Sequence, residues 1–131
     1  MKRRVPDMKD FRDLRVWDKS HRLTLRIYSV SANFPKYELY GLISQIRRCS
    51  ASIGANVAEA CGKRGNKAFQ RYLQIASGSA CELDYHLLLS RDLGFLAEAD
   101  YGDLSKQLTE VRKMLTSLLQ KIDTECLMAK C

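Results

Sequence analysis

The stretch QIRRCSASIGANVAEACGKRGN, residues 45–66, decides the fold of this chain. It has the pattern of most of a long helix followed by the turn that ends it. Its apolar residues continue an upstream lane with spacings of three and four, the period of one helix face. That lane consists of Leu39, Leu42, Ile46, Cys49, Ile53, Val57 and Ala60. We therefore expect a helix from Lys36 to Cys61 with this lane in the core.

A second lane, of polar residues, runs beside the apolar one with the same period. Its members are Gln45, Arg48, Ser52, Asn56 and Glu59. The third side of the helix is rich in alanine, serine and tyrosine, and Arg47 is its one charge. A helix this poor in charge is not an ordinary surface helix. We expect a structural polar seam between helices and subunits; the alternative is a ligand-lined channel at an oligomer axis.

The turn Gly62-Lys63-Arg64-Gly65-Asn66 closes this helix. We expect Gly62 to take the left-handed conformation after the C-terminus and Asn66 to cap the next helix. The two glycines leave backbone N–H groups approachable beside several cations. The turn lacks the spacing of a P-loop, but it is a candidate phosphate site. Its cations are Lys63, Arg64 and the following Lys67, with Arg71 next to them.

The next helix is expected over 67–93, with Gly94 as its stop. Its inward residues are Phe69, Leu73, Ala76, Ala80, Leu83 and Leu87. In an antiparallel hairpin, Gly78 would lie opposite small residues of the preceding helix and let the backbones approach closely. The same register would pair Arg48 with Glu82, which joins Glu82 to the polar seam.

Two further helices complete the chain. One is expected from Asp13 or Leu14 to about Ala32, ended by Pro35. The other is expected over 100–125, with an unbroken apolar lane at spacings of three and four. That lane consists of Tyr101, Leu104, Leu108, Val111, Leu115, Leu118 and Ile122. With short connections and no strand signal, we predict an all-α, antiparallel up-down-up-down four-helix bundle. The bundle would span 13–125, between a basic N-terminal arm (1–12) and a C-terminal tail (126–131).

Positive charge is concentrated in the first part of the chain. Residues 1–71 hold 16 Lys and Arg against 6 Asp and Glu, whereas residues 72–131 hold 6 against 9. Five cations recur at spacings of three and four along the first helix, and they form a basic stripe: Arg12, Arg15, Lys19, Arg22 and Arg26. A stripe of this kind suits contact with phosphates.

No catalytic, metal or cofactor motif is visible in the sequence. His21 and His86 are the two histidines, so di-iron and ordinary zinc sites are disfavoured and we expect His86 to be a satisfied polar position. The five cysteines include no CxxC pair and are expected to be free thiols, with Cys126 and Cys131 the reactive ones. We predict a non-enzymatic protein. No apolar run is long enough to span a bilayer, and we expect a cytoplasmic location.

Several blocks of the sequence resemble one known family. The blocks are F11-x-x-L14-x-V16-W17, then F34-P35-x-x-E38-x-x-G41-L42-x-x-Q45-I46-R47-R48, then S50-x-S52-I53-x-x-N56-V57-A58-E59, and finally F69-x-x-x-L73-x-I75-A76-x-G78-S79-x-x-E82-L83. They are similar to the bacterial four-helix bundle proteins encoded in intervening sequences of large-subunit ribosomal RNA genes. The resemblance implies a homo-oligomer, most often a pentamer. Related bundles are accessory proteins of diversity-generating retroelements, which implies nucleic acid, a reverse transcriptase or a ribosomal component as a partner.

The sequence is compatible with three functions. The first is an oligomeric accessory protein that binds RNA through phosphates without base specificity, since the basic stripe has no interleaved aromatic residues. The second is a protein-interaction scaffold whose basic face docks an acidic partner. The third, small-molecule binding in a central pore, rests on the polar seam alone.

Overall fold

A computed structural model of the chain describes residues 10–130, and the side chains of residues 10–125. Most of the expected N-terminal arm (1–9) and the side chains of the expected tail, with Cys126 and Cys131, lie outside the described residues. The elements are a 3-10 turn η1 (Phe11–Asp13), α1 (Arg15–Ser31), a 3-10 turn η2 (Lys36–Glu38), α2 (Leu42–Cys61), α3 (Asn66–Asp92) and α4 (Glu98–Lys130).

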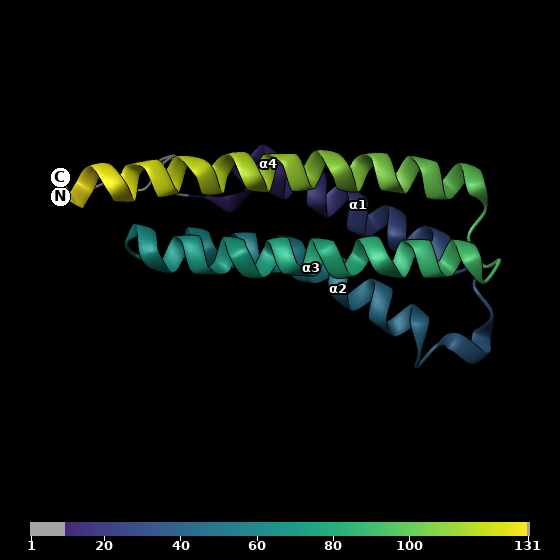
Figure 1. Cartoon of the computed structure of the whole chain (residues 1–131). Helices are drawn as coiled ribbons and strands as arrows, with labels where there is room; N and C mark the ends of the chain where they lie inside the picture. The colour runs from purple at the N-terminus through teal and green to yellow at the C-terminus, as the bar shows by residue number, and fades with distance from the viewer. Residues whose placement is uncertain (1–9, 131) are drawn as a thin grey trace.

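The four helices form the predicted bundle, and the described residues contain no strand. α1 contacts α2 and α4, and α3 also contacts α2 and α4, so each helix packs on two neighbours. Successive helices run in opposite directions (Figure 1), which brings the start of α1, the α2–α3 turn and the end of α4 to one end of the bundle.

The apolar lanes build the core as the sequence indicates. Phe69, Leu73, Ala76, Ala80, Leu83 and Leu87 of α3 are all fully buried, and so are most members of the α4 lane. Since each buried aliphatic side chain contributes roughly 1.5–3 kcal/mol, these two lanes supply much of the stability of the bundle.

The second helix begins six residues later than predicted. Residues 36–38 form η2, and Gly41, with φ −108° and ψ −111°, separates this turn from α2. The Glu38 carboxylate accepts a hydrogen bond from the Leu42 backbone N–H at 3.1 Å and so caps α2. Leu39, expected in the core, is instead 48% exposed. In Figure 1 the start of α2 and η2 angle away from α3 and α4.

Two expectations about the α2–α3 turn are wrong. Gly62 has φ −83°, in the right-handed region, and the left-handed residue is Gly65 with φ 81°. Asn66 is the first residue of α3 rather than its cap, and its side-chain amide donates to Glu125 of α4. Gly65 therefore adopts the left-handed conformation that was expected of Gly62.

The close approach expected at Gly78 is also wrong. A Cβ added there would meet no atom within 4 Å, so Gly78 faces open space. The tight contact lies at Gly54 instead, where an added Cβ would be 3.4 Å from Trp17 Nε1 and 3.5 Å from Ser20 Oγ. The small residue therefore brings α2 close to α1 rather than to α3.

Candidate nucleic-acid interface

Two of the five cations of the basic stripe, Lys19 and Arg26, are paired with acids of α4. Lys19 Nζ donates to Glu110 Oε2 at 2.6 Å. The Arg26 guanidinium reaches Asp100 at 3.2 Å and Asp103 at 3.4 Å. Each acid lies more than 70 positions after its cation in the sequence, so only the fold brings them together.

The remaining cations of the stripe divide into paired and free residues. Arg22 pairs with Asp18 one turn earlier at 3.0 Å. Arg12 pairs with Asp10 at 3.2 Å. Arg15 makes no ion pair with any described residue. Each of the other four members therefore has an acid partner, and the stripe offers far less net positive charge than the sequence indicates.

A second cluster of cations surrounds the α2–α3 turn. We call Lys63, Arg64, Lys67 and Arg71 the basic turn. Lys63 lies 3.5 Å from the Glu59 carboxylate and over the ring of Tyr72 at 5.2 Å. Arg64, Lys67 and Arg71 make no ion pair with any residue between 10 and 125. Three of these four cations therefore have no acid partner among the described residues, compared with one of the five in the stripe.

The start of α3 adds to this positive charge. Its N-cap Gly65 has no side-chain hydrogen bond to the helix, and the first turn of α3 contains no acidic residue. The first backbone N–H groups of a helix lack intrahelical partners and carry a partial positive charge, so they favour an anion. The backbone and the basic turn therefore favour the same kind of ligand.

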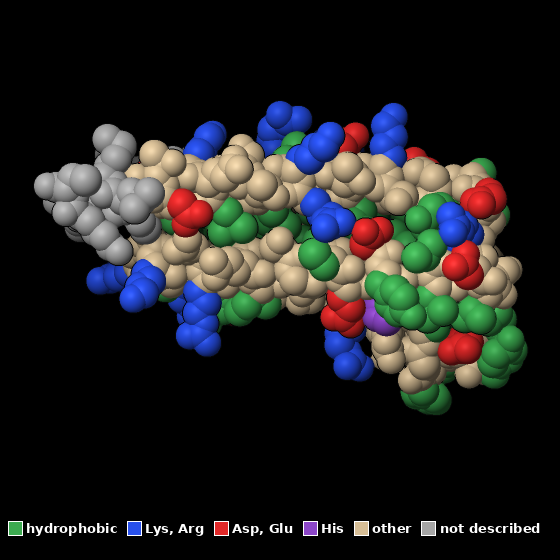
Figure 2. Space-filling model, in the orientation of Figure 1, with side chains coloured by type: hydrophobic (Ala, Val, Ile, Leu, Met, Phe, Trp, Pro, Cys, Tyr) green, Lys and Arg blue, Asp and Glu red, His purple; other side chains and the backbone are tan. Residues whose placement is uncertain are grey.

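A shallow groove of about 740 Å³ follows the basic turn along α3. Its lining consists of Lys63, Arg64, Lys67, Ala68, Gln70, Arg71, Tyr72 and Gln74. Figure 2 shows Lys and Arg side chains projecting from the end of the bundle where α2 meets α3. The sequence indicated Lys63, Arg64, Lys67 and the neighbouring Arg71. It missed Tyr72, which lies beside Arg71, about one helical turn after Lys67 on α3.

The polar seam is only partly a contact between helices. Ser52 Oγ lies 2.8 Å from Ser79 Oγ of α3, and the Asn56 amide donates to Ser52 Oγ at 3.0 Å. Gln45 and Glu59 are exposed, with Glu59 paired to Lys63 as described.

The expected Arg48–Glu82 salt bridge does not form. Arg48 donates to Ser44 Oγ at 3.4 Å, while the Glu82 carboxylate pairs with His86 at 3.3 Å on α3. Both side chains are exposed, and each has its partner one turn away on its own helix. The hairpin register itself is close to the predicted one, because Ser52 meets Ser79.

Across the described part of the chain, no helix combines the length and the apolar character that crossing a bilayer requires.

Comparison with known proteins gives a match to one family model and matches to solved structures. The family model described as 23S rRNA-intervening sequence protein matches residues 12–117. A crystal structure of a protein of unknown function from the S23 ribosomal protein family of Bacteroides thetaiotaomicron superposes with a TM-score of 0.72. It is 31% identical in sequence, and the alignment covers 79% of this chain and 97% of the other. Among curated proteins no match is found.

Proposed function

The chain belongs to the 23S rRNA-intervening sequence protein family, and from this premise we propose that it binds RNA through phosphates at the basic turn. It acts as a non-enzymatic accessory protein, in association with ribosomal RNA or with a retroelement-type partner such as a reverse transcriptase. The observation that carries the proposal is the set of cations at the α2–α3 turn, Arg64, Lys67 and Arg71, which have no acid partner among the described residues.

Free cations favour this surface over the stripe for a thermodynamic reason. A phosphate that binds Lys19 or Arg26 must compete with carboxylates already within 2.6–3.4 Å. A phosphate that binds Arg64 or Lys67 displaces only water and mobile ions, and the release of counterions from RNA drives binding. Arg15 is the one described member of the stripe that offers the same advantage.

The groove also suits a single strand better than a duplex. Tyr72 lines it among the cations, and an aromatic ring beside phosphate-binding residues can stack on a base without selecting its identity. We therefore expect binding with little sequence preference and a strong dependence on salt.

Assembly into a homo-oligomer, a pentamer by resemblance, is part of the same proposal. The outer face of α2 supports it, since Ala51 and Ala55 are exposed there and Arg47 is the one charge of that alanine-rich side. An oligomer would repeat the basic turn once per subunit, and several weak phosphate contacts along one strand would add to a useful affinity.

The test compares two triple variants of the full chain in binding to a mixed-sequence RNA oligonucleotide. Arg64→Gln, Lys67→Gln and Arg71→Gln together should weaken binding at least about ten-fold and reduce the slope of log affinity against log salt by about two. The matched control, Lys19→Gln, Arg22→Gln and Arg26→Gln, removes the same charge and should change affinity less.

Unchanged affinity in the basic-turn variant, or binding that does not vary with salt, would contradict the proposal. An acidic protein docked by the same cations is the competing outcome. It would be recognised by a partner that remains bound to the wild type after nuclease treatment and is lost in the basic-turn variant.

A further inference from the structure

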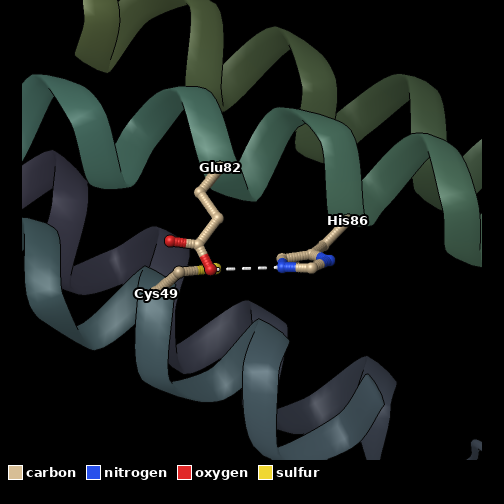
Figure 3. A group of neighbouring side chains, drawn as sticks. All are labelled: Cys49, Glu82 and His86. Carbon is tan, nitrogen blue, oxygen red and sulfur yellow. Dashed lines mark hydrogen bonds and ion pairs between the residues drawn. The ribbon is translucent and has the colours of Figure 1, made fainter. Parts of the chain in front are cut away.

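Three side chains with metal-binding atoms meet between α2 and α3, away from the basic turn. They are Cys49 of α2 and Glu82 and His86 of α3 (Figure 3). One sulfur, one carboxylate oxygen and one ring nitrogen all lie within 4.8 Å of one another. Glu82 and His86 are four residues apart, so they share one face of α3, and that face meets Cys49 across the hairpin.

The three residues differ in burial in a way that suits a ligand site. Cys49 and His86 are buried, at 4% and 8% exposure, whereas the Glu82 side chain is 58% exposed. Packing therefore holds the sulfur and the imidazole in place. The carboxylate can move, and it leaves a path from solvent to the other two.

His86 and Cys49 make few hydrogen bonds within the protein. His86 Nε2 lies 3.3 Å from Glu82 Oε2, but Nδ1 is buried without a hydrogen-bond partner in the described part of the chain. The Cys49 thiol donates to the Ile46 carbonyl at 3.6 Å, a long contact within its own helix. The expectation that His86 is a fully satisfied polar residue is therefore wrong.

We propose that Cys49, Glu82 and His86 bind a divalent transition-metal ion, with Zn²⁺ the best match to this set of ligands. Thiolate, imidazole and carboxylate are the ligands of zinc sites, while Mg²⁺ and Ca²⁺ require oxygen ligands throughout. Three protein ligands leave a fourth, water-filled position toward solvent. Around a tetrahedral ion the ligand atoms stand roughly 3.5 Å apart. His86 Nε2 and Glu82 Oε2 already lie 3.3 Å apart, so binding requires the Cys49 sulfur to approach them.

Binding changes the ionisation of the cysteine. Burial and then the charge of Glu82 raise the pKa of the Cys49 thiol to about 12, so it is protonated at neutral pH. A cation between the sulfur and the carboxylate reverses both effects. The ion takes the place of the thiol proton, which leaves to solvent, and affinity therefore rises with pH.

The ion would join α2 to α3 and stabilise the folded chain. It would bind more weakly than a four-ligand structural zinc, because among the described residues no group forms a hydrogen bond to His86 Nδ1 that would fix the ring. Metal occupancy is independent of the basic turn, so either proposal can fail alone.

The test uses Co²⁺ as a spectroscopic probe in the reduced, metal-free full chain. The background carries Cys81→Ser, Cys126→Ser and Cys131→Ser, so that the exposed and terminal thiols do not contribute. We expect a thiolate-to-cobalt charge-transfer band in the near ultraviolet, displaced by Zn²⁺ and not by Mg²⁺. Cys49→Ala should abolish the band, and Cys61→Ala, a second buried cysteine of α2, should retain it.

Glu82→Gln keeps the test decisive if Cys49→Ala fails to fold, because Glu82 is exposed. It should weaken Co²⁺ binding at least about ten-fold while circular dichroism remains that of the parent. Absence of the band in the background protein, its survival in Cys49→Ala, or unchanged affinity in Glu82→Gln would each overturn the proposal.

Discussion

Whether a charged residue of this chain is available to a ligand depends on partners far away in the sequence. Lys19 alone looks like one cation of a phosphate-binding stripe, and the fold places Glu110 2.6 Å from it. A hydrogen bond from Lys19 and then its charge hold the pKa of Glu110 below the ordinary value of 4.5. The pair is half exposed, so its contribution to stability is small, yet it decides that Lys19 is not free for a ligand.

The Glu110 pKa gives a direct check of this pairing. Because the folded pKa is lowered, the stabilisation is present above pH 4.5 and is lost as the pH falls through the folded pKa. An NMR titration of the Glu110 carboxyl should give a pKa below 4.5 in the wild type. In Lys19→Met the pKa should return toward 4.5, and an identical pKa in both proteins would mean that the pair does not persist in solution.

Helices are the scale at which the sequence was most informative. The apolar lanes at spacings of three and four predicted four helices, their order and most of the buried apolar residues of α2, α3 and α4, since one buried stripe per helix leaves a clear period. Where the period continued through a glycine the prediction failed. Leu39 continues the apolar lane of α2, but Gly41 and the Glu38 cap make α2 begin at Leu42. Leu39 therefore lies outside the helix.

Glycines inside and between the helices give a second prediction. Gly78→Ala should raise the free energy of unfolding by up to about 1 kcal/mol, because the helix gains propensity and the added Cβ meets no atom within 4 Å. Gly65→Ala should lower it by about 1 kcal/mol, since φ there is 81°. Denaturant unfolding measures both, and a destabilised Gly78→Ala would indicate that another subunit packs against that position.

At the scale of the whole molecule, the two ends of the bundle differ in chemistry. The basic turn lies at one end. Exposed apolar side chains gather at the other, around η2 and the end of α3, and include Tyr37, Leu39, Tyr40 and Leu93. Figure 2 shows this concentration beside η2 and the α3–α4 turn. The sequence predicted the cations Lys63, Arg64 and Lys67 but not their advantage over the stripe, since that depends on acids of α4.

The outer face of α2 makes assembly testable in the intact chain. Ala51 and Ala55 are exposed one turn apart, and a charged helix face would be expected if water covered it. Light scattering of the wild type should therefore give a mass several times 15.0 kDa. Ala51→Arg with Ala55→Glu should lower that mass toward the monomer, because both introduced charges would lose hydration in a subunit contact.

A pair of substitutions on α4 separates an interface effect from a general effect of charge. Thr116 and Gln120 are also exposed and four residues apart. Thr116→Arg with Gln120→Glu adds the same charges on a helix already covered by charged residues, and should leave the mass of the wild type unchanged. If the α2 variant keeps the wild-type mass, or if the wild type is a monomer at micromolar concentration, the exposed alanines have another role. The low charge of the outer face of α2 would then indicate contact with a partner other than a second copy of this chain.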